Sequence, residues 1–316
     1  MPWRTPPVDL DPPDISPHRA GNTGIDYVTS YKATEPGPHV MLNALTHGNE
    51  ICGAIILDEL MKAGLRPARG TLTFSFANVA AYQSFSAKDP LISRYLDEDF
   101  NRIWDDKSLA GPRRSREMAR AQVMRPIVDT VDILLDIHST SAIDLPMMLT
   151  GWEEKHLAFA RRMGVPELLV RDSGHVSGKR LRDYGRFNDP AAAPIALLVE
   201  SGQHWAKESV AIAREATWRF LATAGVLSDA DAAPWREPPT TPTRTILVTD
   251  RISIQTDDFQ FAQAFNGFDI LPHKGTLVAR DGRTELRTPY DNCVLVMPAK
   301  RPSRGHLAVR LGRFED

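Results

Sequence analysis

Short apolar runs alternate with amphipathic segments along the first two thirds of this chain. A short apolar run bounded by polar or turn-forming residues predicts a buried strand, and apolar residues at helical spacing predict a helix. Strands that alternate with helices are typical of an α/β fold with a mostly parallel mixed sheet and flanking helices. The predicted strands are 38–45, 71–79, 132–138, 167–170 and 196–200, and the predicted helices are 51–64, 115–131, 153–163 and 204–224.

The two ends of the chain follow different patterns. Five prolines among the first thirteen positions exclude a helix there, so we expect residues 1–24 to form an extended arm. Residues 228–244 are rich in proline and small polar residues, which indicates a linker after a main domain of residues 25–227. Residues 245–316 lack helical periodicity and combine spaced glycines with short apolar runs, which predicts a small β-rich C-terminal domain.

The composition argues against two classes of binding partner, nucleic acids and membranes. The formal net charge is −2, from 38 basic and 40 acidic side chains, so the chain has no electrostatic reason to bind nucleic acid or an anionic membrane. No apolar run approaches the ~20 residues that span a bilayer, and the N-terminus lacks the apolar stretch of a secretion signal. The two cysteines, Cys52 and Cys293, are expected to be buried thiols rather than a disulfide. These features favour a cytoplasmic protein.

Polar residues follow three of the predicted strands at the point where each strand ends. His47 and Glu50 come after the first strand in an H-x-x-E pattern; His138 ends DILLDIH and Glu200 ends IALLVE. The carboxyl ends of parallel strands meet at one edge of an open sheet, where ligands bind. Two imidazoles and a carboxylate are a frequent ligand set of catalytic zinc, with a fourth position left for water. We therefore expect His47, Glu50 and His138 to bind zinc, and Glu200 to take a proton from the water.

Each of these signals has an ordinary structural explanation when it is taken alone. An H-x-x-E pattern also occurs where a surface helix begins, because its dipole favours a glutamate there. His138 alone can be a hydrogen-bonded core histidine. A glutamate at the end of an apolar strand is harder to explain, because an unpaired buried carboxylate is costly. The combination at three strand ends favours the metal site.

The segment SRYLDEDFNRIW (93–104) adds planar hydrogen-bond donors. Its Arg94, Asn101 and Arg102 suit carboxylates and a developing oxyanion, although ordinary ion pairs in a solvated loop would explain them without the metal cluster. We expect His175 to face solvent in a loop. His204 is equally suited to line the site or to start a helix.

Four motifs occur in a fixed order, THGNE (46–50), R-Y-x-x-x-D-F-N-R (94–102), DIHST (136–140) and VESGQ (199–203). In this order they resemble the succinylglutamate desuccinylase/aspartoacylase family, a branch of the zinc carboxypeptidase fold. The resemblance covers residues 38–225 closely and the C-terminal region loosely. It implies a zinc carboxypeptidase-like fold and an amidohydrolase that removes the acyl group from a small N-acyl amino acid.

The resemblance also implies a role for each motif residue and one Zn²⁺ per chain. The implied set is the zinc ligands His47, Glu50 and His138, the general base and acid Glu200, the carbonyl-polarising Arg94, the carboxylate-binding Asn101 and Arg102, and Asp99, which orients His47.

The chain departs from aspartoacylases in two places. Those enzymes carry a tyrosine in the C-terminal domain that reaches the site, and the comparable stretch VMPAKRPSRGH (296–306) has none. The loop 171–194 is longer than its aspartoacylase counterpart, which holds a substrate-reading arginine. Arg180, Arg182 and Arg186 are all candidates for that role, so the resemblance leaves the identity of the substrate open.

Two other functions would use the same metal ligands. A metallocarboxypeptidase would cleave the last residue of a peptide, and a non-catalytic zinc-binding regulatory protein would need neither Glu200 nor Arg94. The resemblance favours the deacylase, whose partner is a small N-acyl amino acid. Assembly into a homo-oligomer stays open.

Overall fold

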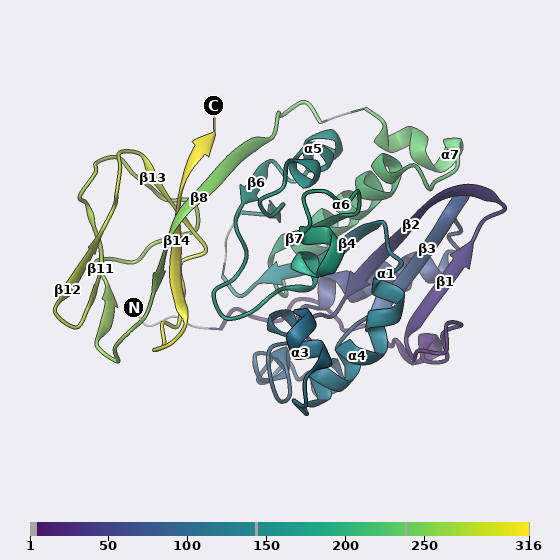
Figure 1. The fold of residues 1–316 in the computed structure, drawn as a ribbon, viewed down its shortest axis with the longest axis horizontal. Coiled ribbons are helices and arrows are strands. Elements are labelled where there is room, and N and C mark those ends of the chain that lie inside the picture. Colours follow the sequence, from purple (N-terminus) through teal and green to yellow (C-terminus); the bar gives the residue numbers. More distant parts are fainter. Residues whose placement is uncertain (1–4, 143–144, 238, 316) are drawn as a thin grey trace.

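An eleven-stranded mixed sheet runs through the molecule, and a three-stranded sheet lies at one end (Figure 1). The structure is a computed structural model that describes residues 5–142, 145–237 and 239–315. In spatial order, the strands of the large sheet are β1 (Val28–Lys32), β3 (Arg69–Phe76), β2 (Glu35–Ala44), β4 (Ile133–Thr140), β7 (Ile195–Gln203), β5 (Met147–Leu149), β6 (Leu168–Arg171), β8 (Arg244–Ser253), β14 (Leu307–Glu315), β13 (Cys293–Val296) and β10 (Ile270–Leu271).

The centre of the large sheet is parallel, which confirms the predicted fold class. β2 pairs in parallel with β3 and β4, and β4 pairs in parallel with β7. β1 and β5 run antiparallel to β3 and β7, so the sheet as a whole is mixed. The carboxyl ends of β2, β4 and β7 therefore lie side by side, at the edge where ligands of open α/β sheets bind.

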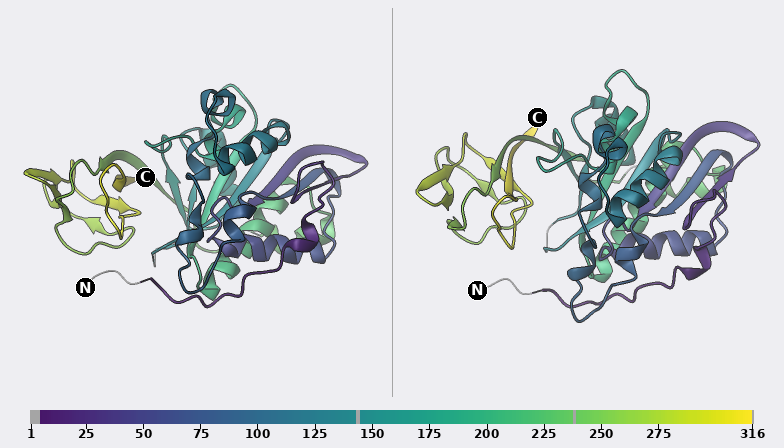
Figure 2. Two further views of the ribbon diagram at one scale, coloured as in Figure 1. Left: turned by 90° about the horizontal axis from the view of Figure 1, so that it is seen from below. Right: turned by 60° about the horizontal axis from the view of Figure 1, so that its bottom comes forward.

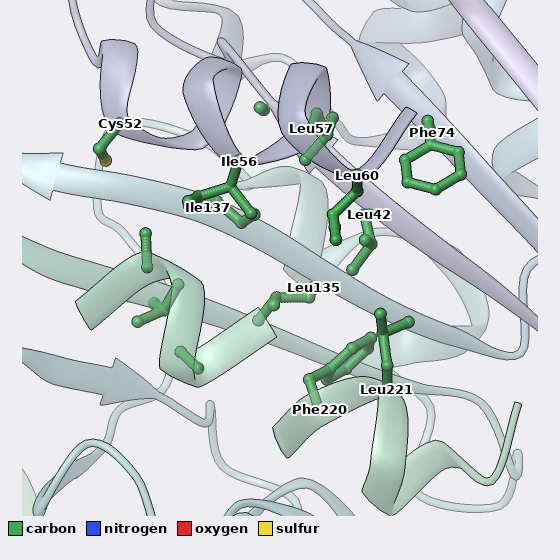
Figure 3. Close-up of a cluster of buried hydrophobic side chains, with 14 of the residues drawn as sticks. Leu42, Cys52, Ile56, Leu57, Leu60, Phe74, Leu135, Ile137, Phe220 and Leu221 are labelled. Carbon is green, nitrogen blue, oxygen red and sulfur yellow. The ribbon is translucent and has the colours of Figure 1, made fainter. Parts of the chain in front are cut away.

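Helices cover both faces of this part of the sheet. Successive residues of a strand point to opposite faces. Leu42 and Leu135 therefore pack with Leu197 in one hydrophobic core, part of which Figure 3 shows, while Met41 and Leu134 pack in the other. In the described part of the chain, no helix combines the length and the apolar character that crossing a membrane requires. The longer helices are α1 (Ile51–Lys62), α5 (Glu154–Met163) and α6 (Lys207–Ala224) on the first face and α4 (Arg116–Val128) on the second, and the shorter ones are α2 (Val79–Tyr82) and α3 (Asp106–Ala110).

The five predicted strands and four predicted helices are all present, with ends that differ from the prediction by at most three residues. The start of α6 shows why. β7 continues to Gln203 and the chain then turns, so the helix begins at Lys207 rather than at residue 204. Cys52 and Cys293 are buried and free, as expected.

The N-terminal segment is extended and packs along the outside of the helix-covered body (Figure 2). Its described residues contain one short 3₁₀ turn, η1 (Ser16–His18). Leu10 and Ile15 are buried in the first core, and the Tyr82 hydroxyl donates to the carbonyl oxygen of Pro13 at 2.6 Å. These contacts fix the path of the segment.

The C-terminal part is β-rich, as predicted, but its strands are divided between the two sheets. β8 pairs in parallel with β6, so β8, β14, β13 and β10 continue the large sheet. The small sheet consists of β12 (Thr284–Arg287), β11 (Leu277–Asp281) and β9 (Phe259–Phe261). The segment 228–244 contains α7 (Asp229–Ala232) and the 3₁₀ turn η6 (Ala233–Trp235), and its role as a linker between domains stays a prediction.

Candidate metal centre

A tight turn after β2 brings two expected metal ligands together. Gly48 lies against the backbone of α2, where an added Cβ atom would be 2.4 Å from backbone atoms of Ala81 and Tyr82. Only glycine fits at this position. The turn then leads into α1, for which Glu50 is the N-cap residue, so that the His47 and Glu50 side chains face each other.

His138 completes a buried cluster with these two residues. Nδ1 of His47 lies 2.7 Å from Glu50 Oε1, and Nδ1 of His138 lies 2.8 Å from Glu50 Oε2. One ligand atom from each residue lies within 4.8 Å of the other two. The three residues are at most 3% exposed. This group can bind a metal ion.

The carboxylates of the cluster stabilise a positive charge on or beside the two imidazoles. Burial raises the pKa of the Glu50 carboxyl, but the neighbouring His47 and His138 outweigh burial and hold that pKa well below its usual value. Burial lowers the pKa of His138, but Asp136 and Glu50 outweigh burial and raise it well above its usual value. A metal ion would therefore compete with protons for the imidazole nitrogens.

A further carboxylate contacts the second ring nitrogen of each imidazole. Asp99 Oδ1 lies 3.0 Å from Nε2 of His47, a contact in line with the role that the resemblance implies, and Asp136 Oδ2 lies 2.8 Å from Nε2 of His138. Such contacts orient metal-binding histidines and raise their basicity. The sequence analysis missed Asp136. The D-x-H spacing was the available signal, because residues two apart on a strand point to the same face.

Glu200 stands beside this cluster with an unsatisfied oxygen. It pairs in register with His138 across β4 and β7 and is 7% exposed. Among the described residues, its Oε2 atom has no hydrogen-bond partner. Burial, followed by the charge of Glu50, raises the pKa of Glu200 to about 8. A buried oxygen without a partner fits a site for water or a cation, and two imidazoles with a carboxylate fit zinc.

The cluster opens into a pocket of about 220 Å³. Arg94 lies at its wall, where Nη2 donates to Asp99 Oδ2 at 3.1 Å and Nη1 donates to Glu50 Oε1 at 3.4 Å. Asn101 and Arg102 line the pocket as well. Asn101 Oδ1 accepts from the backbone N–H of Leu181 at 2.8 Å, so this side chain also fixes the loop 171–194.

The three candidate arginines of that loop have different surroundings. Arg180 lines the pocket. Arg182 is buried away from the pocket, where Nη2 donates to the carbonyl oxygens of Thr150 and Ala196 at 2.9 and 3.1 Å. Arg186 is exposed and donates to backbone carbonyls beyond α4. The structure thus brings one of the three candidates to the site.

Two histidines also line the pocket. The expectation that His175 faces solvent is wrong: the side chain is half-buried at the pocket, because the loop folds back over Arg102. Burial, together with Arg102 and Arg310, lowers the pKa of His175 to about 3. His204 is buried at the pocket wall, and its Nδ1 lies 2.8 Å from the Ser139 hydroxyl oxygen.

The C-terminal region supplies a wall that the sequence analysis did not identify. Lys300 and Arg310 both line the pocket. Neither lies in a recognisable motif, and both reach the site only because the C-terminal strands continue the sheet. The stretch 296–306 thus contributes a lysine where the resemblance led us to look for a tyrosine.

Comparison with known proteins agrees with the resemblance of the four motifs. A family model of the succinylglutamate desuccinylase/aspartoacylase catalytic domain matches residues 36–222. Aspartoacylase from Xenopus tropicalis is 27% identical over 124 residues, which cover 36% of this chain and 38% of that protein. Aspartoacylase from Rattus norvegicus is 27% identical over 126 residues, again 38% of its length. The alignments thus span about two fifths of these curated relatives.

Solved structures share the fold over most of the chain. Succinylglutamate desuccinylase from Vibrio parahaemolyticus superimposes with a TM-score of 0.68 at 17% identity, covering 92% of this chain and 87% of that one. The corresponding protein from Vibrio cholerae gives a TM-score of 0.67 at 18% identity, with coverage of 92% and 88%.

Proposed function

Because this chain belongs to the succinylglutamate desuccinylase/aspartoacylase family, we propose that it is a zinc-dependent hydrolase that cleaves the amide bond of a small N-acyl amino acid. The observation that carries the proposal is the buried cluster of His47, Glu50 and His138 beside the unpaired Oε2 of Glu200. A merely structural cation site would need no such carboxylate. The pocket above the cluster has the size of a small molecule.

In this proposal, His47, Glu50 and His138 would hold one zinc ion. The ion would supply Lewis acidity and lower the pKa of water. Asp99 and Asp136 keep the two imidazoles in position through their Nε2 atoms.

Glu200 moves the proton. Its buried carboxylate accepts a proton from the attacking water and passes it to the leaving amine, so one residue serves as base and then as acid. A pKa raised to about 8 by burial and Glu50 suits a group that both takes and returns a proton near neutral pH.

The arginines and Asn101 bind and orient the substrate. Arg94 lies beside Glu50 and can donate to the amide oxygen as negative charge develops there. Asn101 and Arg102 line the same pocket and bind the α-carboxylate, which fixes the amide against the cluster.

The test is turnover by the zinc-loaded protein. We expect amine release from at least one member of a panel of N-acetyl and N-succinyl amino acids. Glu200→Gln should keep the zinc and lower kcat by about 10²–10⁴-fold, the range for a lost general base. Glu208→Gln, at an exposed position of α6, is the matched control and should leave kcat unchanged.

Other outcomes would redirect the proposal. Release of C-terminal residues from peptides, without turnover of the panel, would favour a metallocarboxypeptidase. Bound zinc without turnover of either class would favour a regulatory protein. Loss of zinc from Glu200→Gln would show that Glu200 is a ligand rather than the base.

A further inference from the structure

His204 is a buried histidine at the pocket wall to which the proposed function assigns no role. It lies in the turn between β7 and α6, is 2% exposed and lines the pocket. Its backbone N–H donates to the carbonyl oxygen of Thr140 at 2.8 Å. Nε1 of the next residue, Trp205, donates to the carbonyl oxygen of Asn49 at 3.0 Å. These two bonds fix the turn to β4 and to the turn that carries the metal ligands, so the imidazole is held in place.

One hydrogen bond decides which ring nitrogen of His204 carries the proton. Nδ1 lies 2.8 Å from the hydroxyl oxygen of Ser139, a residue that is 3% exposed. Among the described residues this is the only hydrogen bond of that hydroxyl, and a buried hydroxyl that does not donate is costly. Ser139 therefore donates and Nδ1 accepts, which leaves the proton of the neutral ring on Nε2.

The Nε2 atom of His204 is an uncharged donor that is open to a ligand. Within the described part of the chain it has no hydrogen-bond partner, and it does not belong to the fully enclosed polar atoms. Burial lowers the pKa of His204 to about 4, against the effect of Glu50. The charges of Arg94, His47 and His138 act in the same direction as burial. The imidazole is thus neutral near pH 7, and its Nε2 can donate but not accept.

His204 stands at the metal end of the pocket. The charged groups that act on it are those of the metal cluster and Arg94, whereas His175 is acted on chiefly by the arginines of the other end. The proposed function places the amino-acid half of the substrate at Asn101 and Arg102 and the scissile carbonyl beside Arg94. The acyl half then extends toward the wall that contains His204.

We propose that His204 is a specificity-determining residue that donates a hydrogen bond from Nε2 to an oxygen on the acyl half of the substrate, beyond the scissile carbonyl. The inference rests on the proposed function and adds a class of acyl group to it. His204 carries no charge that would balance an acidic acyl group, so the oxygen that it suits best is uncharged, as in a short hydroxyacyl group. A buried donor that is left without an acceptor disfavours an analogue that lacks this oxygen.

The experiment compares the N-glycolyl and N-propionyl derivatives of the same amino acid. The two acyl groups have equal numbers of non-hydrogen atoms, and the hydroxyl group of the first replaces a methyl group of the second. With the zinc-loaded protein, kcat/KM should be about 5- to 100-fold higher for the glycolyl substrate, the range for one buried donor that loses its acceptor. His204→Leu removes the donor and should abolish this preference.

Four further variants control for shape, proton position and folding. His204→Phe keeps an aromatic ring without a donor and replaces His204→Leu if that variant does not fold. His204→Gln carries an amide donor and should restore part of the preference. Ser139→Ala removes the group that keeps the proton on Nε2 and should reduce the preference although His204 is present. His273→Leu changes an exposed histidine of the C-terminal region and should leave the preference intact. Zinc content and thermal unfolding are measured for each variant.

The inference is overturned if the wild type does not distinguish the two acyl groups, or if loss of the imidazole lowers kcat/KM equally for both. Failure of the proposed function has a different signature. If neither compound is hydrolysed, calorimetry measures how tightly each one binds to the zinc-loaded protein. Tighter binding of the glycolyl compound that depends on His204 would retain the hydrogen bond to the acyl half and remove the hydrolase assignment. Equal binding would remove both.

Discussion

The two ends of the pocket carry opposite charge although one sheet builds both. At the carboxyl ends of β2, β4 and β7, the carboxylates of Glu50, Asp136 and Glu200 surround two imidazoles. At the other end, Arg102 and Arg310 lie 3.9 and 3.6 Å from two carboxylates that other arginines bind more closely, Asp99 and Asp172. The first end is suited to a cation and the second to an anion. A molecule with an amide oxygen at one end and carboxylates at the other would be aligned by this difference.

The two ends also differ in how they are assembled. The metal ligands come from one turn and one adjacent strand, whose ends are fixed by pairing of β2 with β4. The arginines come from positions 102, 180 and 310, which lie far apart in the chain and meet through the loop 171–194 and the C-terminal strands. Three variants test these differences.

The largest effect is expected at the metal end. His138→Ala removes one of three ligands, so the purified variant should hold almost no zinc, whereas the wild type should hold about one ion per chain. Elemental analysis measures this directly. His273→Ala changes an exposed histidine of the C-terminal region and should keep its zinc. Normal zinc content in His138→Ala would place the metal elsewhere.

The next effect concerns the buried contacts that support the arginine-lined end. Arg182→Ala should lower the free energy of unfolding by about 1–3 kcal/mol, because it removes a donor from the buried carbonyl oxygens of Thr150 and Ala196, whereas Asp183 keeps its ion pair with Arg180. Arg186→Ala, four residues further on and exposed, should change it by about 0.5 kcal/mol or less. Urea unfolding measures both. Equal losses would contradict the structural role assigned to Arg182.

The smallest effect is expected from an orienting carboxylate. Asp136→Asn keeps the shape of the side chain but weakens its hold on His138 Nε2. Zinc affinity should fall about 10- to 100-fold, as for other carboxylates behind metal-binding histidines. Competition with a chelator measures the Kd. Asp257→Asn, at an exposed position, is the control, and an unchanged Kd in both would show that Asp136 does not tune the metal.

The metal end could be predicted from the sequence because its residues lie in one turn and at the ends of neighbouring strands. His47 and Glu50 share one turn, and a strand-end rule places His138 and Glu200 beside them, where β4 and β7 bring them into register. Only Asp136 escaped notice there, although it stands two residues before His138 on the same face of the strand.

The arginine-lined end could not be predicted from the sequence because its residues meet only through contacts between distant parts of the chain. Arg180 and Arg182 lie two residues apart in a loop, and their buried partners Asp172 and Asp183 decide their surroundings. Arg310 lies in a strand without a motif. Its approach depends on the pairing of β8 with β6, which hydrophobic patterning does not specify.

The unbroken sheet between β7 and β14 has a consequence for the length of the ligand that the pocket can hold. Glu200 and Arg310 sit on strands separated by β5, β6 and β8, so backbone hydrogen bonds, rather than a hinge, set the span between them. Neighbouring strands keep a spacing of about 4.8 Å, which makes the sheet a fixed scale. The sheet therefore fixes the distance between the metal cluster and the arginine-lined wall of the pocket, and a ligand that contacts both must match that distance.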